Sequence, residues 1–164
     1  MISWREGNRS RLAPLSCLLV LMLLTGRSGW AEESESDEVR TATIQVTFTD
    51  LEPDRGGDLV ASLFRGEEGW LEPEGVMASV KGPVDGQSME LTFEDVPFDE
   101  SYAIQVFHDA NRNGKLDFRR IIPIPKEGVG VSNNHTRMGP PKYDKAEFAV
   151  DREELRLSII LRYY

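Results

Sequence analysis

Cysteine and histidine are both scarce in this sequence of 164 residues, which has one cysteine and two histidines. A single cysteine cannot form a disulfide within the chain, so no disulfide framework holds the fold together. The two histidines, His108 and His135, are too few for a catalytic zinc site of the three-histidine type. The sequence also has no glycine-rich phosphate loop and no serine or cysteine nucleophile motif, so it offers no signature of nucleotide binding or of nucleophilic catalysis.

Long apolar runs are absent apart from one near the amino terminus. Three arginines precede the run LAPLSCLLVLMLLTG (residues 12–26), which is too short to span a bilayer comfortably. Gly29 and Ala31 then provide the small residues of a signal-peptidase site. The pattern predicts a secretory signal peptide over residues 1–31, cleaved after Ala31, with an uncleaved anchor as the alternative. We therefore expect an exported protein, periplasmic or extracellular, with no membrane span after cleavage.

Basic residues are few in the expected mature chain. Removal of residues 1–31 takes away four of 19 bases and one of 28 acids, leaving 15 against 27 and a net charge of −12. This charge disfavours nucleic acid and anionic membrane surfaces as partners, and it leaves cations, cationic partners or neutral ligands. The expected partner is an unidentified envelope protein or glycan, while the sequence does not predict an oligomeric state.

Helical periodicity is also lacking, and an alternation of period two takes its place. Apolar and polar residues alternate through TATIQVTFT (residues 41–49), which is typical of a strand with one buried face. Turn-forming residues separate such segments. The pattern predicts an all-β fold, a small antiparallel Greek-key β-sandwich of immunoglobulin or prealbumin type with about seven strands. The other predicted strands are 59–65, 88–95, 102–108, 146–150, 155–163 and, more weakly, 76–81.

The mature chain is expected to form one domain. Residues 32–41 are charged and nearly devoid of large apolar side chains, which predicts a disordered acidic linker. Residues 42–164 then form a single β-sandwich domain, since the remaining length suffices for one core and not for two. The predicted core residues, taken from the buried face of each strand, are Phe48, Leu63, Phe93, Val106, Phe148 and Ile159.

The segment HDANRNGKLD (residues 108–117) has the alternate-residue spacing of a calcium loop. Calcium binds several oxygens at once, and Gly114 stands where such loops turn sharply. Arg120 replaces the usual bidentate glutamate, and four bases against two acids over residues 109–120 predict weak binding, with a dissociation constant on the order of 0.1–1 mM. The alternative is an ion-free β-turn closed by its own side chains. The candidate ligands are Asp109, Asn111, Asn113, Lys115 through its carbonyl, and Asp117.

A second candidate site lies in the long polar stretch of residues 121–145, which shows no alternation. Loops of this length in compact domains are usually functional or disordered. The polar cluster here predicts an ordered ligand-binding loop, and the alternative is a solvated loop whose asparagines satisfy its own backbone. The candidate ligand-binding residues are Asn133, Asn134, His135, Arg137 and Tyr143.

Three strings in this chain carry a resemblance to a known family: FEDVPFDESYAIQVFHDANRNGKLD, IPKEGVGVSNN and GPPKYDKAEF. Over residues 42–164 the chain resembles an exported bacterial family catalogued as domain of unknown function 2141. The resemblance implies an exported single-domain β protein and supplies neither an activity nor catalytic residues. The chain is more distantly similar to prealbumin-like sandwiches of carboxypeptidase-regulatory and adhesin-repeat domains, in which a comparable loop can hold calcium.

The leading hypothesis from the sequence is a non-enzymatic module of the cell envelope, binding or structural, with calcium as its only expected cofactor. One alternative is a carbohydrate- or peptidoglycan-binding domain that uses Trp70, Tyr143 and the asparagine loop, because exposed aromatic rings stack on sugars. Another alternative is a hydrolase in which His108, Asp109 and His135 converge, although a histidine at a strand end is more often a structural hydrogen-bonding group.

Overall fold

The structure is a computed structural model that describes residues 40–98, 100–134 and 139–164. The predicted signal peptide, almost all of the predicted acidic linker, and the candidate site residues His135 and Arg137 lie outside the described residues. The described strands are β1 (Thr41–Thr49), β2 (Asp58–Arg65), β3 (Val76–Pro83), β4 (Ser88–Pro97), β5 (Ser101–Asp109), β6 (Val129–Val131), β7 (Phe148–Ala149) and β8 (Glu154–Ile160). The short helices are η1 (Pro53–Arg55), η2 (Pro73–Gly75), η3 (Ser132–Asn134) and α1 (Tyr143–Ala146).

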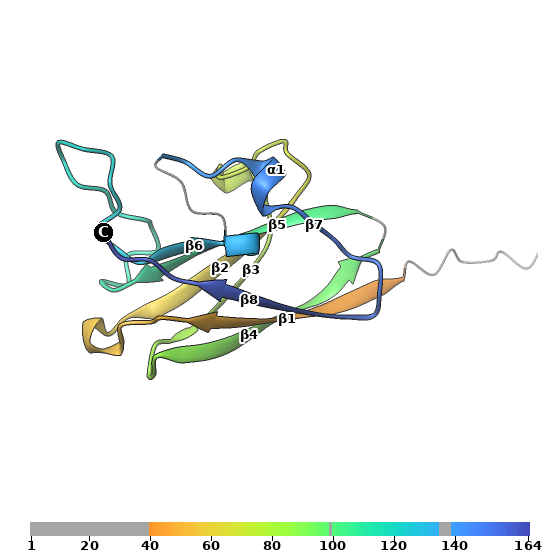
Figure 1. Cartoon of the computed structure of the whole chain (residues 1–164), viewed down its shortest axis with the longest axis horizontal. Helices are drawn as coiled ribbons and strands as arrows, with labels where there is room; N and C mark the ends of the chain where they lie inside the picture. The colour runs from red at the N-terminus through yellow and green to blue at the C-terminus, as the bar shows by residue number, and fades with distance from the viewer. Residues whose placement is uncertain (1–39, 99, 135–138) are drawn as a thin grey trace, which may run out of the picture. The chain divides into compact units, whose positions relative to one another are not determined.

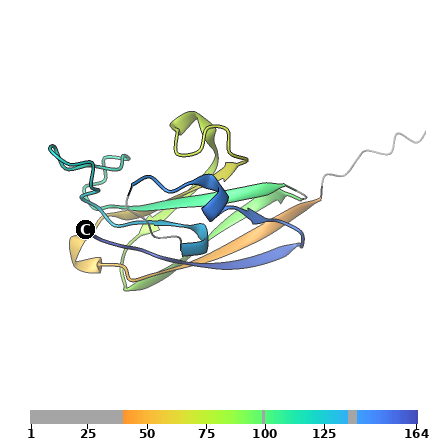
Figure 2. The same ribbon diagram turned by 45° about the horizontal axis from the view of Figure 1, so that its top comes forward.

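The strands form two sheets, which confirms the predicted all-β sandwich (Figures 1 and 2). One sheet has the order β4-β1-β8, and the other has the order β3-β2-β5-β6. In the second sheet, β7 also pairs with the first two residues of β5. All seven predicted strands have a counterpart, but the predicted strand 146–150 is reduced to β7 because Ala146 belongs to α1, and the predicted strand 155–163 ends at Ile160. The structure adds β6, a strand of three residues that is too short to show an alternating pattern in the sequence.

One pair of strands departs from the predicted antiparallel arrangement. β1 runs antiparallel to β4 on one side and parallel to β8 on the other, from the pair Thr43 and Glu154 to the pair Thr49 and Ile160. Parallel neighbours need a long connection, and nearly the whole domain lies between these two strands. A period of two reports which face of a strand is buried and not the direction of its neighbour, so the sequence pattern did not reveal this pair.

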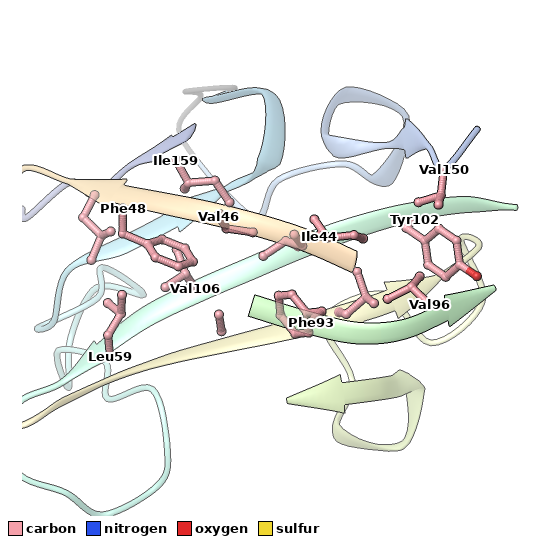
Figure 3. Packing of buried hydrophobic residues seen from close by; sticks show 14 of the residues in the cluster. Ile44, Val46, Phe48, Leu59, Phe93, Val96, Tyr102, Val106, Val150 and Ile159 are labelled. Carbon is pink, nitrogen blue, oxygen red and sulfur yellow. The ribbon is translucent and has the colours of Figure 1, made fainter. Parts of the chain in front are cut away.

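The core lies between the two sheets and takes one face of each (Figure 3). Along β1 the residues Ile44, Val46 and Phe48 are fully buried, while the threonines and the glutamine between them are exposed or half-buried. Five of the six predicted core residues are at most 1% exposed, and Phe148 is half-buried against the same cluster. The alternation read from the sequence therefore identified the core correctly.

The outer face of β5 is also covered, by residues that the sequence assigned to a long loop. Ala103 of β5 packs with Val131, Tyr143 and Ala146 in a second apolar cluster, and Trp70 lies against it. The stretch 121–145 thus contributes β6, η3 and α1 in place of one continuous loop. Within the described part of the chain, no helix has the length and apolar character needed to cross a membrane.

Candidate functional site

The candidate calcium loop begins where β5 ends. Asp109, the last residue of β5, is 3% exposed, and its carboxylate accepts hydrogen bonds from the main-chain N–H groups of Asn113 (3.0 Å) and Gly114 (2.7 Å). Gly114 has a φ of 74°, in the left-handed region that glycine tolerates best. Asp109, the first candidate ligand, therefore fixes the conformation of the turn by accepting hydrogen bonds from the main chain of the turn.

The other predicted side chains gather on the same turn. The Asn111 carboxamide oxygen accepts from the N–H of Asn113 (3.0 Å), and the Asn113 oxygen accepts from the N–H of Lys115 (2.8 Å). Both carboxamide nitrogens donate to one oxygen of Asp117, at 2.9 Å and 3.2 Å. The structure therefore brings Asp109, Asn111, Asn113 and Asp117 together, and their mutual hydrogen bonds close the loop as Asx-turns do.

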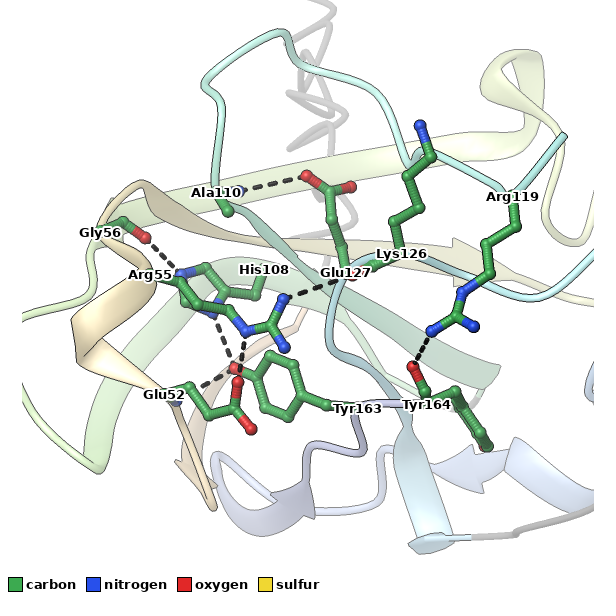
Figure 4. Close-up of polar contacts among 10 residues, drawn as sticks. All are labelled: Glu52, Arg55, Gly56, His108, Ala110, Arg119, Lys126, Glu127, Tyr163 and Tyr164. Atoms are coloured by element: carbon green, nitrogen blue, oxygen red, sulfur yellow. Dashed lines mark hydrogen bonds and ion pairs between the residues drawn. The ribbon is translucent and has the colours of Figure 1, made fainter.

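Glu127 completes the loop and was not identified from the sequence. It is 4% exposed, and its two carboxylate oxygens accept from the N–H groups of Ala110 (3.2 Å) and Asp117 (3.0 Å); Figure 4 draws the first of these bonds. The expected acid position, Arg120, is exposed. Glu127 was missed because spacing rules for a continuous loop stop at that arginine. An available signal was the isolated acid in IPKEGVG, between a proline-rich stretch and a glycine.

His108 lies next to this loop and is fully buried. Its Nε2 faces the carbonyl oxygen of Gly56, which can only accept, so Nε2 carries the proton; Nδ1 then accepts from the Tyr163 hydroxyl at 2.7 Å (Figure 4). The same hydroxyl accepts from the N–H of Glu52 at 3.1 Å. Burial raises the pKa of Tyr163 above its ordinary value of 10.0, because the phenolate would lose solvation.

The proposed hydrolase constellation of His108, Asp109 and His135 is not assembled by the described residues. Successive side chains of a strand point to opposite faces, so His108 points to the β1–β2 turn while Asp109 binds its own loop. Both ring nitrogens of His108 have partners within the protein. His135 lies outside the described residues. Within the described part of the chain, His108 joins three segments and has the role of a structural hydrogen-bonding group.

The donor atoms of the loop suit a hard cation and no softer metal. Carboxylate, carboxamide and main-chain oxygens are the ligands that calcium takes. Among the residues the structure describes, no three histidine, cysteine, aspartate or glutamate side chains form a group able to hold a metal ion. A cation here would therefore need the carboxamide oxygens and the Lys115 carbonyl as well as the acids. Arg112 opposes a cation, although its ion pair with Asp58 (3.2 Å) offsets part of its charge.

The two asparagines of the second candidate site bind the protein's own backbone. Asn133 donates to the Glu147 carbonyl at 2.7 Å. Asn134 donates to the Ser158 carbonyl at 2.9 Å and accepts from the Ile160 N–H at 2.7 Å. These partners lie outside residues 121–145, so the asparagines bind other segments of the protein and not, as the alternative had expected, the backbone of their own loop. They fasten η3 to the chain before β7 and to β8, two segments distant in sequence.

The aromatic residues of the second candidate site are packed together. Tyr143 is 6% exposed and Trp70 lies edge-on to it, with ring centroids 5.8 Å apart. The Trp70 ring also meets Phe64 at 4.9 Å, and its Nε1 donates to the Pro141 carbonyl at 2.8 Å. Tyr143 opens α1, which covers the sheet, so its ring packs in the second cluster and does not present a face to a sugar. Trp70 is partly buried against the same cluster and is held there by Phe64 and Pro141.

A comparison with models of known protein families found a match for this chain. A family model described as "Uncharacterized protein conserved in bacteria (DUF2141)" matches residues 46–158, from within β1 to within β8. The chain belongs to this family. The resemblance identified from the sequence is thereby confirmed, and it brings no activity with it. Searches of curated proteins and of solved structures gave no significant match.

Within this DUF2141 chain, the strings that carried the resemblance correspond to one structural unit. The first string ends in the loop closed by Asp109, the second contains Glu127 and the asparagines of η3, and the third contains Tyr143. Residues distant in sequence thus close one end and one face of the sandwich. The glutamate and the asparagines act through main-chain bonds, which explains how separate motifs cooperate in a single framework.

Proposed function

We propose that this DUF2141 protein is an exported, non-enzymatic β-sandwich module of the cell envelope with a binding or structural role. The sequence pattern of residues 1–31 supports export. A non-enzymatic role is supported by His108, the histidine that the structure describes. Its side chain is fully buried, and both of its ring nitrogens are hydrogen-bonded within the protein. Across the described part of the chain, no buried side-chain nitrogen or oxygen lacks a hydrogen-bond partner.

We further propose that the loop of residues 109–117 binds calcium weakly. The observation that carries this proposal is the gathering of Asp109, Asn111, Asn113 and Asp117 on one tight turn, where each oxygen that accepts a main-chain bond keeps a second lone pair. Two acids with two nearby bases favour the weak end of calcium affinity, on the order of 0.1–1 mM. A site of this strength would be filled outside the cytosol and empty within it.

Calorimetry tests the calcium proposal on residues 32–164, which include every residue that the structure describes. With about 5 mM calcium, within reach of weak sites, we expect binding heat and a higher melting temperature. Asp117→Asn should remove both effects, whereas Asp85→Asn, a matched change at an exposed turn residue, should leave them intact. Absence of heat and of any melting shift in the unaltered protein would show that the loop is an ion-free turn.

The location and the partner are tested separately from the metal. Mass spectrometry of the protein recovered from a periplasmic extract should give a chain that begins at Glu32; a chain that retains residues 1–31 would contradict cleavage after Ala31.

Capture from envelope extract, with and without chelator, then asks whether an envelope protein or a glycan is retained. If neither is retained in either condition, the structural role is favoured over the binding role.

A further inference from the structure

The last residues of the calcium loop and the chain that follows them up to Glu127 form a protruding hairpin, here called the finger (residues 115–126, of which 115–117 also belong to the loop). Phe118 pairs with Pro125 in an isolated bridge, and the N–H of Arg119 donates to the Ile124 carbonyl at 2.9 Å. In both views this segment, coloured teal, extends away from the two sheets (Figures 1 and 2). The finger is thus an ordered projection beyond the strands.

The tip of the finger is apolar and exposed. Ile121 is 96% exposed, Ile122 55% and Phe118 50%. Tyr164, at 58%, belongs to the same region because Arg119 donates to its main-chain oxygen at 2.6 Å. These four are all but one of the large apolar side chains that stand exposed among the described residues. Three of them are on the finger and Tyr164 is bonded to it, and such a concentration of exposed apolar side chains marks a surface that meets an apolar environment.

The finger is also basic, in a chain whose net charge is −9. Lys115, Arg119, Arg120 and Lys126 are all exposed. The finger has a single acid, Asp117, and its carboxylate already accepts from the two carboxamides of the calcium loop. None of the ion pairs found among the described residues involves these four bases. Apart from Arg119, which donates to the Tyr164 main-chain oxygen, these bases present their positive charge to solvent, against the sign of the whole molecule.

The base of the finger is held to the sandwich. Glu127 binds the N–H of Asp117, and the N–H of Lys126 donates to the Asp117 carbonyl at 2.9 Å. Arg55 adds a longer bond to the Lys126 carbonyl at 3.4 Å (Figure 4). Because both strands of the finger are fixed at this point, the finger projects from the sandwich in one direction.

We propose that the finger docks on an anionic lipid membrane surface, with Phe118, Ile121 and Ile122 entering the headgroup region and the bases contacting lipid phosphates. Apolar side chains backed by lysine and arginine bind such surfaces through buried area and charge together. A stable protein interface needs roughly 1,000 Å² or more of buried surface, whereas the finger offers three exposed large apolar side chains, Phe118, Ile121 and Ile122. A bilayer accepts a projecting apolar tip without a preformed pocket.

This inference extends the proposed function to a different surface and does not require calcium. The net charge of the chain disfavours general adhesion to anionic membranes. The orientation of the molecule makes binding compatible with its net negative charge. Only the basic finger approaches the membrane, while the acidic remainder of the protein points away from it. Binding should therefore be specific to one face of the molecule and sensitive to salt, since exposed charges are screened beyond about 10 Å at 0.1 M salt.

Vesicle sedimentation tests the proposal on residues 32–164 in the presence of chelator, so that failure of the calcium proposal cannot affect the result. We expect binding to vesicles containing phosphatidylglycerol, little binding to pure phosphatidylcholine vesicles, and release by high salt. The double variant Ile121→Ser and Ile122→Ser should lower the partition coefficient about tenfold or more. Lys115→Glu combined with Arg120→Glu should reduce binding to the anionic vesicles alone.

Two controls match these changes away from the finger. Met77→Ser removes an apolar side chain that is 41% exposed on β3, and Lys81→Glu combined with Lys142→Glu reverses two exposed bases outside the finger. Both should bind vesicles as the unaltered protein does, and all variants should melt at its temperature. The proposal is overturned if the serine variant binds normally or if anionic lipid gives no advantage. It is equally overturned if, without lipid, the unaltered protein is an oligomer that the serine variant converts to monomers.

Discussion

At the scale of single residues, the end of the sandwich is organised by buried polar side chains that bind backbone groups. Asp109, Glu127 and His108 are each nearly or fully buried; Glu127 and His108 join segments that the strands leave unconnected, and Asp109 closes its own turn. A buried polar group is costly when unpaired, so each of these contacts is strongly defined. The loop owes its shape to these contacts, with or without an ion.

Glu127→Gln tests the importance of the buried carboxylate. Glutamine keeps one acceptor oxygen and places an NH₂ group against one of the two main-chain N–H donors, so one bond is replaced by two opposed donors. We expect the free energy of unfolding to fall by about 1–3 kcal/mol, measured by urea denaturation. Glu94→Gln, at an exposed residue of β4, should change it by less than about 0.5 kcal/mol. Equal effects of the two changes would contradict a clamping role for Glu127.

Tyr163 provides a prediction for alkaline pH. Its pKa in the folded protein is raised above 10.0, chiefly by burial, so the unfolded chain loses this proton first as the pH rises. The stabilising contribution is therefore complete below about pH 10 and is lost as the pH rises towards the folded pKa. Tyr163→Phe should make the decline of the free energy of unfolding above pH 10 shallower, as measured by denaturation at several pH values. An unchanged slope would show that this hydroxyl is solvated in the folded state.

At the scale of elements, β6 depends on close approach to the other sheet. A Cβ atom built on Gly130 would lie 2.9 Å from Ile159 Cγ2 and 3.0 Å from the Ile160 carbonyl. β6 can therefore lie against β8 because its central residue has no side chain. This contact joins the two sheets at the edge where the asparagines of η3 also bind β8.

Gly130→Ala tests that contact. The added methyl group overlaps backbone and packed side chains that cannot move away easily, so we expect a loss of about 1–3 kcal/mol in the free energy of unfolding. Gly86→Ala is the matched control, because its nearest atom, the Ser88 carbonyl oxygen, would be 3.6 Å away. That change should cost less than about 0.5 kcal/mol. A tolerated alanine at Gly130 would mean that β6 is not pressed against β8.

The sequence predicted the long elements well and the short ones poorly. Alternation is reliable over the nine residues of β1, because one face packs on the core throughout. It cannot detect β6, in which three residues pair with β5 and the outer cover comes from α1. The candidate loop was found because its ligands are close in sequence. Glu127 was missed because its position depends on how the finger returns to the sheet.

At the scale of the whole molecule, the candidate calcium loop belongs to a framework at one end of the sandwich, whereas the second candidate site covers a face of the sheet that contains β5. The β1–β2 turn, the loop after β5 and the final residues meet around His108, Tyr163 and Glu127 (Figure 4). The charge of this framework is divided, with the acids bonded inside and the bases exposed on the finger. Net charge alone could not predict this division, because it averages over surfaces of opposite sign.

The most direct test of the account is a calcium titration followed by amide resonances of residues 32–164. The account predicts that the N–H signals of Asn113, Gly114 and Lys115, which the candidate ligands bind, shift with a midpoint on the order of 0.1–1 mM. Amides in the strands of the sheet β4-β1-β8 should remain unchanged. The account would be contradicted if these loop signals stayed fixed up to about 10 mM calcium, ten times the upper end of that range, or if the shifts arose elsewhere in the chain.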